Sequence, residues 1–305
     1  MIYLMLVLGF VFLVKGEDFL VEGTSDIARL LRIPSVIIGL TIVAMGTSAP
    51  EAAVSITAGF TGNNDIALGN VIGSNIFNLL VVVGACAGIK CFDIDKDILK
   101  RDFLVAILST VILLIFVIDS KLSAFEGFVL LALMAGYIFI MIRSAFEGRT
   151  ENDKDKKVFV VKSIMYTLGG IVLVVFGGQL VVNNAVKIAE SFGISENLIA
   201  LTIVAIGTSL PELVTSIVAA GKGNSGLALG NVVGSNIFNI LFILGSSALL
   251  NPISATSENV IDVIVSLVFT GLVLLWCKFK SEINRPVGLI MMLCYIGYTL
   301  YIIAR

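Results

Sequence analysis

The sequence predicts an all-α polytopic membrane protein, in which ten transmembrane helices form two inverted five-helix repeats and helices 2 and 7 are broken. Three observations predict this fold. The chain is far too apolar for a soluble domain, its apolar residues fall into ten segments long enough to cross a bilayer, and one stretch of sequence recurs 161 residues later.

The composition places the chain in a membrane. Of its 305 residues, 58% are hydrophobic and 14% are charged. A spanning helix needs about 20 apolar residues to cross about 30 Å of hydrocarbon. The first apolar segment lacks the basic start and the cleavage site of a secretory signal, so we expect it to be helix 1. The ten predicted helices are centred on 2–22, 35–60, 66–88, 101–118, 124–142, 160–182, 195–220, 227–249, 260–277 and 285–303.

The basic residues predict how the helices are oriented. They gather in alternate loops, which the positive-inside rule places in the cytoplasm. We therefore expect a multi-pass protein of the plasma membrane with both termini outside. The cysteines form no CxxC pair, and we expect them to pack as small apolar residues. The basic residues expected inside are Arg29, Arg32, Lys90, Lys96, Lys100, Arg101, those of 143–162, Lys222, Lys278, Lys280 and Arg285.

An internal repeat divides the chain. Residues 38–80 match residues 199–241 without a gap, and 28 of the 43 positions are identical. The match predicts a first five-helix repeat at 1–142, a cytoplasmic linker at 143–158 and a second repeat at 159–305. Because five is odd, the second repeat enters the membrane from the opposite side. Secondary transporters with such inverted repeats bind their substrate near the bilayer midplane, at helices broken by Gly or Pro.

A proline and a glutamate interrupt the second helix of each repeat, in GTSAPE at 46–51 and GTSLPE at 207–212. The proline lacks a backbone N–H, so we expect carbonyls about one turn earlier to lose their donors. A charge at the bilayer centre costs several kcal/mol. The apolar cores of the predicted helices contain no Lys or Arg to pair with Glu51 and Glu212. Either a bound cation or protonation must therefore neutralise them.

The helix that follows carries further oxygen ligands, in GNVIGSNIFN at 69–78 and GNVVGSNIFN at 230–239. Serine and asparagine stand four residues apart in each copy and therefore share a helix face. Carboxylate, amide, hydroxyl and carbonyl oxygens suit Ca²⁺ or Na⁺. The chain has no histidine and no thiol cluster, which argues against Zn²⁺ and Cu⁺. One Ca²⁺ would neutralise the two glutamates.

These paired motifs resemble the α1 and α2 repeats of the cation/Ca²⁺ exchanger superfamily, most closely its prokaryotic Na⁺/Ca²⁺ exchangers. The resemblance implies an antiporter that exchanges Na⁺ for Ca²⁺ by alternating access, with four cation sites between helices 2, 3, 7 and 8. It implies that Glu51 and Glu212 are central ligands for Ca²⁺ and Na⁺. The other implied ligands are Thr47 and Thr208 at the Ca²⁺ site, Ser48 and Ser209 beside them, Ser74 and Ser235 with the carbonyls of Ala44 and Ala205 at the outer Na⁺ sites, and Asn78 and Asn239 at the middle site.

The resemblance also implies how the ions are coupled. K⁺-dependent relatives carry an Asp where this chain has Asn78 or Asn239, which favours a K⁺-independent exchanger. The family stoichiometry of three Na⁺ per Ca²⁺ would make each cycle electrogenic. A Ca²⁺/H⁺ antiporter stays open, because a desolvated Glu can titrate.

Rival functions and further partners fit the sequence less well. A cation channel is a remote alternative. An intramembrane enzyme lacks the necessary side-chain pairs, so we expect no catalysis. We expect no cofactor, no nucleic acid and no obligatory protein partner, and we expect a monomer in the lipid bilayer to transport Na⁺ and Ca²⁺.

Overall fold

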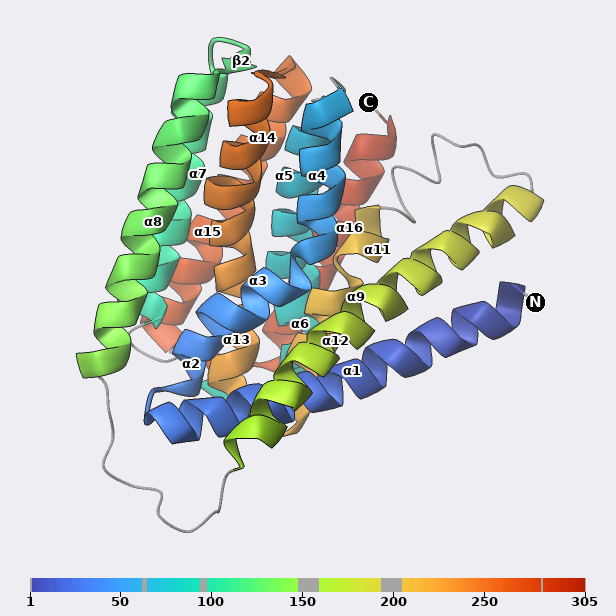
Figure 1. Cartoon of the computed structure of the whole chain (residues 1–305). Helices are drawn as coiled ribbons and strands as arrows, with labels where there is room; N and C mark the ends of the chain where they lie inside the picture. The colour runs from blue at the N-terminus through green and yellow to red at the C-terminus, as the bar shows by residue number, and fades with distance from the viewer. Residues whose placement is uncertain are drawn as a thin grey trace.

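The chain folds into a bundle of helices (Figure 1). The computed structural model describes residues 2–61, 65–93, 98–147, 159–192, 205–280 and 282–304. Its α-helices are α1 (Ile2–Leu31), α2 (Ser35–Ile38), α3 (Ala44–Thr47), α4 (Ala49–Thr61), α5 (Asp65–Phe77), α6 (Val83–Ile89), α7 (Phe103–Val117), α8 (Ala124–Glu147), α9 (Val160–Ser191), α11 (Ala205–Thr208), α12 (Leu210–Gly221), α13 (Ser225–Phe238), α14 (Gly245–Leu250), α15 (Ser257–Lys280) and α16 (Arg285–Ala304).

In the part of the chain that the structure describes, four π-helical turns continue or join these helices. They are η1 (Gly39–Val43) between α2 and α3, η2 (Asn78–Val82) between α5 and α6, η3 (Ile98–Asp102) before α7, and η5 (Asn239–Leu244) between α13 and α14. A π-turn inserts one extra residue into a helix and is frequent at functional sites. Two of the four begin at the predicted ligands Asn78 and Asn239.

The structure supports a polytopic membrane protein with fewer clear spans than predicted. In the described residues, six helices are long and apolar enough to cross a bilayer, and the bent pair from Ser35 to Phe60 would make a seventh. Predicted helix 7 overlaps residues 193–204, and most of the predicted linker is 148–158. Both stretches lie outside the described residues, so the ten-span topology stays a prediction.

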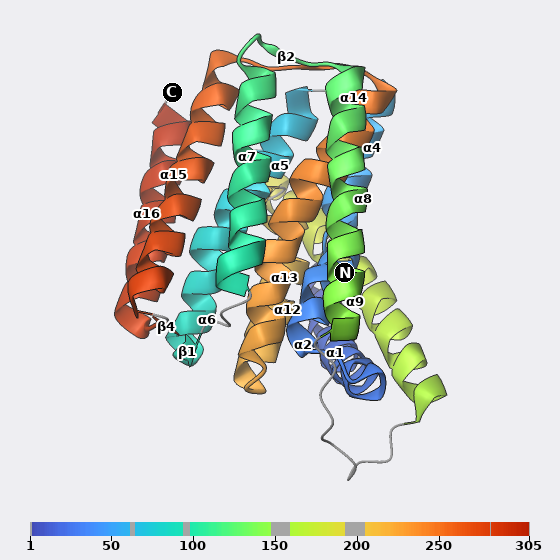
Figure 2. The ribbon, with the colours of Figure 1, turned by 90° about the vertical axis from the view of Figure 1, so that its left-hand side faces the viewer.

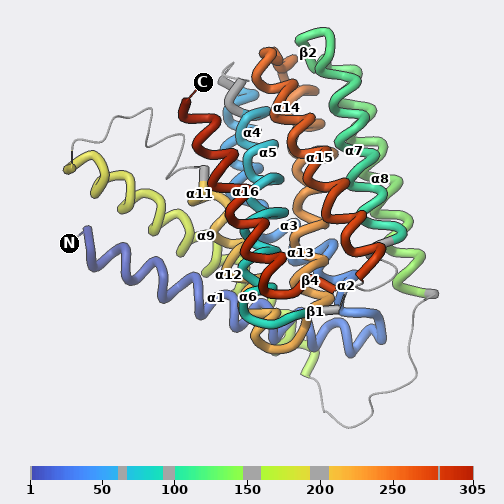
Figure 3. Tube along the Cα trace, turned by 180° about the vertical axis from the view of Figure 1, so that it is seen from behind, coloured from blue at the N-terminus to red at the C-terminus, as the bar shows by residue number. Residues whose placement is uncertain are grey.

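Helices α1 and α9 are longer than the apolar segments that predict them. They continue to Leu31 and Ser191, beyond the expected ends at 22 and 182. Polar residues outside the hydrocarbon can continue a helix, so apolar length underestimates its extent. At about 1.5 Å per residue, each helix is about 45 Å long. The two helices lie side by side and antiparallel, at a steep angle to the rest of the bundle (Figures 1 and 3).

Small residues bring α1 and α9 into backbone contact. Gly9, Gly16 and Gly23 recur every seven residues on α1, and each faces α9. A Cβ atom on Gly16 would lie 3.0 Å from the carbonyl oxygen of Gly170, and a Cβ atom on Gly170 would lie 2.8 Å from that of Gly16. Only glycine allows helices to approach this closely, as it does in many membrane proteins.

The middle of the bundle is formed by two helices that the repeat relates. The apolar windows within Ala67–Ile89 and Ser225–Leu250 are 72% and 94% buried. The windows of the other four clear spans are only 17–33% buried. Those four, α8, α9, α15 and α16, therefore present apolar side chains outward, where a bilayer would cover them.

Two short β-ladders connect the halves of the chain. β1 (Phe92–Asp93) pairs antiparallel with β4 (Glu282–Ile283), and β2 (Lys121–Leu122) pairs antiparallel with β3 (Ile253–Ser254). A shift of 161 residues converts the first ladder into the second in the same register. The repeat therefore extends beyond the matching motifs. The two ladders lie at opposite ends of the bundle (Figure 2).

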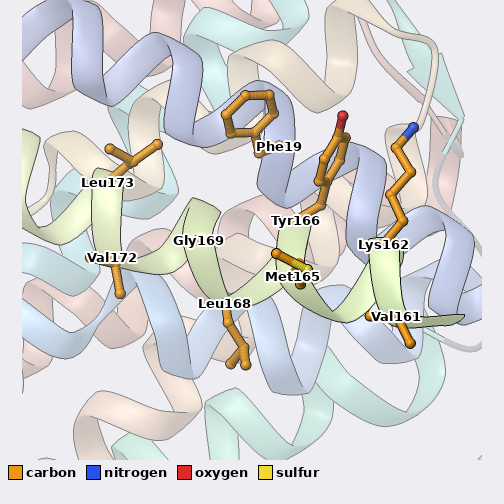
Figure 4. A pocket seen from close by; sticks show the side chains of 9 residues that line it. All are labelled: Phe19, Val161, Lys162, Met165, Tyr166, Leu168, Gly169, Val172 and Leu173. Carbon is orange, nitrogen blue, oxygen red and sulfur yellow. The ribbon is translucent and has the colours of Figure 1, made fainter.

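A groove of about 820 Å³ lies on α9 beside α1 (Figure 4). Its lining is largely apolar, and the rings of Phe19 and Tyr166 pack with their centroids 4.9 Å apart. The Lys162 ammonium lies 4.6 Å from the centre of the Tyr166 ring. None of the predicted ligands lines this groove.

Candidate cation-binding site

Both predicted helix breaks are present. The helix from Ser35 bends by 52° between Thr47 and Ala49, and the later helix is interrupted at Ser209. Pro50 and Pro211 are the second residues of α4 and α12, a position where the missing N–H does no harm. Each glutamate consequently lies in the first turn of a helix, where the helix dipole favours negative charge.

Glu51 is fully buried and is contacted by both halves of the chain. Its Oε1 accepts hydrogen bonds from Ser209 Oγ at 2.9 Å and from Ser74 Oγ at 3.4 Å. Its Oε2 has no hydrogen-bond partner in the described residues. One oxygen is therefore held in place while the other is available to a ligand.

Glu212 has the same environment with the two halves exchanged. It is fully buried, and its Oε1 accepts hydrogen bonds from Ser48 Oγ at 2.8 Å and from Ser235 Oγ at 3.4 Å. Its Oε2 also lacks a partner within the described part of the chain. Neither glutamate forms a salt bridge with a described basic residue. The described residues therefore leave two buried carboxylates without a counter-charge, which is unfavourable unless a cation or a proton binds.

The two threonines are buried just before the breaks, at positions that the repeat relates. Thr47 donates to Asn231 Oδ1 at 3.0 Å. The amide nitrogen of Asn231 lies 3.1 Å from Ser216 Oγ and 3.4 Å from the carbonyl oxygen of Glu212. Asn231 of α13 therefore contacts both broken helices, the first through Thr47 and the second through Ser216 and the carbonyl of Glu212. Thr208 occupies the equivalent position in the second half.

The carbonyl of Ala44 does not lose its donor, contrary to the expectation from the proline. It accepts the backbone N–H of Ser48 at 3.0 Å, because the break begins one residue later. The hydroxyl of Ser235 also lies 3.5 Å from it. A cation could use this oxygen only beside those donors. Ala205 is the first residue of α11, directly after residues that lie outside the description.

The two asparagines are oriented by their amide nitrogens. Asn78 Nδ2 donates to Asn236 Oδ1 at 3.3 Å, and Asn239 Nδ2 donates to Asn75 Oδ1 at 3.0 Å. The Oδ1 atoms of Asn78 and Asn239 are buried and have no partner among the described residues. Since an amide oxygen only accepts hydrogen bonds, these two atoms are further candidate cation ligands.

Asn75 and Asn236 were not predicted to matter, and they connect the two halves. Each donates its amide N–H to the backbone carbonyl of the other at 3.1 Å. The 161-residue shift relates the two asparagines, so equivalent residues of the two halves contact each other here. Their signal in the sequence is an amide inside an apolar helix, repeated identically in both copies of GSNIFN.

The unpartnered oxygens together define the chemistry of the site. Six buried side-chain oxygen atoms in the described residues lack a hydrogen bond. Four belong to predicted ligands, namely one each on Glu51, Glu212, Asn78 and Asn239, and two belong to Glu17 of α1. No described cluster of three His, Cys, Asp or Glu residues could hold a metal. Carboxylate and amide oxygens in a mixed set match the ligands of hard cations.

Buried carboxylates at helix breaks, between two halves related by a repeat, are typical of a membrane transporter for cations. The chain belongs to the sodium/calcium exchanger family, because residues 1–143 and 162–304 match the family described as Sodium/calcium exchanger protein. The family consists of ion antiporters rather than enzymes.

Individual relatives agree with this assignment. The chain is 34% identical over 338 residues to the sodium/calcium exchanger MaX1 of Methanosarcina acetivorans, covering 97% of each. It is 32% identical over 302 residues to the inner membrane protein YrbG of Escherichia coli, covering 94% of this chain and 92% of YrbG. The solved structure of the sodium-calcium exchanger NCX_Mj soaked with 10 mM Na⁺ superimposes with a TM-score of 0.86 at 34% identity, over 97% and 98% of the two chains.

Proposed function

We propose that this protein exchanges Na⁺ for Ca²⁺ by alternating access, with three Na⁺ per Ca²⁺ and without K⁺. One observation carries the proposal. Glu51 and Glu212 are fully buried, are held by serines of both halves and each retain one oxygen that has no hydrogen bond to a described residue. Two negative charges without a basic partner in the described part of the chain need two positive charges, which one Ca²⁺ or two Na⁺ supply.

The remaining ligands are assigned around these two carboxylates. In this proposal Ca²⁺ lies between Glu51 and Glu212, and the same two glutamates also bind Na⁺. The buried oxygens of Asn78 and Asn239 support the middle site. The other proposed ligands are Thr47, Thr208, Ser48, Ser209, Ser74, Ser235 and the carbonyls of Ala44 and Ala205.

Alternating access requires that the site can face either side of the membrane. The proposed architecture is an inverted pair of five-helix repeats, 1–142 and 159–305, with the linker 143–158 in the cytoplasm and both termini outside. The equivalent β-ladders at opposite ends of the bundle support the inversion. The proposed location is the plasma membrane, where the protein works as a monomer.

Two arguments concern the proposed coupling of three Na⁺ to one Ca²⁺ without K⁺. Neutral Asn78 and Asn239 keep the formal charge of the central site at two, which favours K⁺ independence. Three Na⁺ against one Ca²⁺ moves one net charge, so the membrane potential contributes about 2.3 kcal/mol per 100 mV. The inward Na⁺ gradient then drives Ca²⁺ out of the cell.

Reconstituted liposomes test the proposal. Ca²⁺ uptake is measured at clamped pH and voltage, with Na⁺ loaded inside and K⁺ absent. We expect uptake that requires the Na⁺ gradient and is lost in Glu51→Gln and in Glu212→Gln, because each amide removes one of the two charges. Glu190→Gln, an exposed carboxylate on α9, serves as the matched control and retains transport.

Other outcomes point to the rival functions. Ca²⁺ uptake driven by a pH gradient without Na⁺ identifies a Ca²⁺/H⁺ antiporter. Ca²⁺ current without any opposing ion gradient identifies a channel. Either result overturns the proposed Na⁺ coupling.

A further inference from the structure

Glu17 is the third buried glutamate of the described residues, and it lies outside the predicted cation sites. It belongs to α1 and is 0% exposed. Neither of its carboxylate oxygens has a hydrogen-bond partner in the described part of the chain. A buried carboxylate without hydrogen-bond donors is unfavourable unless a cation or a proton binds it.

The polar group beside Glu17 is a hydroxyl, which can act as a hydrogen-bond donor or as a cation ligand. The side chain of Thr215 lies beside it on α12. The hydroxyl of Thr215 donates to the carbonyl of Pro211 at 2.7 Å, so its lone pairs are available to a cation. The carboxylate of Glu212 is also close enough to interact electrostatically with Glu17. Glu212 and Thr215 stand three residues apart and share a face of α12.

The nearest ammonium group is already engaged. Lys222 follows the last residue of α12 and forms an ion pair with Asp18 at 2.8 Å. Both side chains of this pair are partly exposed, 43% for Lys222 and 38% for Asp18. Along α12, Thr215 lies between buried Glu212 and exposed Lys222. Glu17 therefore lies between the central site and the surface at this end of α12.

The position of Glu17 is not repeated in the other half. A shift of 161 residues leads to Gly178 of α9. A Cβ atom on Gly178 would lie 3.5 Å from Cγ of Pro211, so this glycine packs against the broken helix. Since a glycine is sufficient for packing at the equivalent position, the carboxylate of Glu17 indicates a function on one side only.

We propose that Glu17, together with the hydroxyl of Thr215, binds Na⁺ between Glu212 and the surface at Lys222. This site rests on the proposed function and extends it. Among the described residues, the three buried glutamates carry three negative charges. Cations at the central site balance those of Glu51 and Glu212, and a Na⁺ that stays at Glu17 balances the third, so this ion is additional to the three Na⁺ that exchange for one Ca²⁺.

Equilibrium binding of ²²Na⁺ to the purified full-length chain at saturating Ca²⁺ tests this site. We expect about one Na⁺ per chain in the wild type and none in Glu17→Gln, by the charge balance of the three carboxylates. Glu22→Gln is the matched control. Glu22 is on the same helix, is half exposed and lies 3.3 Å from Lys162, so its variant retains the bound Na⁺. Binding of ⁴⁵Ca²⁺ without Na⁺ stays unchanged in both variants.

A second variant covers the case in which Glu17→Gln does not fold. Thr215→Val keeps the shape of the side chain and removes the proposed hydroxyl ligand. We expect this variant to lower the affinity for the retained Na⁺ about ten-fold, within the range for loss of a supporting ligand. Ca²⁺ binding again stays unchanged.

Two results would overturn the inference. One is equal Na⁺ binding by the wild type and Glu17→Gln. The other is a wild type that retains no Na⁺ at saturating Ca²⁺, which would mean that the carboxyl group carries a proton. Failure of the wild type to bind Ca²⁺ would instead contradict the proposed function, so the two failures are distinguishable.

Discussion

At the scale of single residues, serines from opposite halves hold the two glutamates. Ser48 donates to Glu212 and Ser209 donates to Glu51, at 2.8 and 2.9 Å. Hydrogen bonds to a carboxylate are shorter and stronger than those between neutral groups. The serines therefore position one oxygen of each glutamate and leave the other free for an ion.

This arrangement predicts the effect of removing one serine. We expect Ser48→Ala to weaken Ca²⁺ binding about ten-fold, because Glu212 loses its shortest hydrogen bond and its orientation. Ser209→Ala has the same effect through Glu51. Ser247→Ala is the control, since this buried hydroxyl donates to the carbonyl of Ser55 at 2.8 Å instead. Equal loss of ⁴⁵Ca²⁺ affinity in the control would contradict the assignment.

The sequence pattern predicts some of these functional residues and not others. Glu51 and Glu212 stand out because a charge inside an apolar segment needs a reason, and because the segment is repeated. Asn75 and Asn236 matter through a contact between halves, which no local pattern reports. Glu17 lies in KGED, where charged neighbours suggest a solvated helix end. Its burial depends on packing against a helix about 200 residues away.

At the scale of elements, the contact between α1 and α9 depends on glycine. We expect Gly170→Leu to push the two helices apart, since a Cβ atom there already lies 2.6 Å from the backbone nitrogen of Leu20. Overpacking of this kind costs about 1–3 kcal/mol. Thermal unfolding in detergent measures the loss. The adjacent Gly169→Leu is the control, because a Cβ atom there meets nothing within 4 Å, and an equal loss in both variants would contradict the prediction.

The elements also show what a sequence pattern can and cannot indicate. Proline correctly predicts both breaks, because the missing N–H acts locally. The π-turns at Asn78 and Asn239 were not predicted, since the residues after them are apolar on every face and show no periodicity that one inserted residue could shift. The break also leaves the carbonyl oxygen of Ala44 bonded to the N–H of Ser48. Its exact position within the turn depends on the backbone rather than on the proline alone.

At the scale of the whole molecule, the proposed orientation can be tested by labelling. Lys121 of β2 is expected outside and Cys91, next to β1, is expected inside. We expect an impermeant maleimide to label Lys121→Cys in sealed right-side-out vesicles, in a chain whose native cysteines are replaced. Cys91 retained alone is labelled only after the vesicles are opened. Labelling of both positions in sealed vesicles would contradict the inverted arrangement.

The reciprocal hydrogen bonds have an energetic consequence. A shift of 161 residues interchanges the pair of Ser48 with Glu212 and the pair of Ser209 with Glu51. In the proposed alternating-access cycle, a conformation open to one side would therefore have a counterpart of similar free energy open to the other. Ions then need only a small difference in affinity to change which conformation predominates.

One exception to this reciprocity is an ion pair, and Glu17 opposite Gly178 is another. The ion pair of Asp18 with Lys222 would correspond to Gln179 with Thr61, which carry no charge. A surface ion pair contributes up to about 1 kcal/mol, or roughly a five-fold bias in population. An ion pair that forms in only one of the two proposed conformations would therefore give the molecule a preferred resting state and leave the other state thermally accessible.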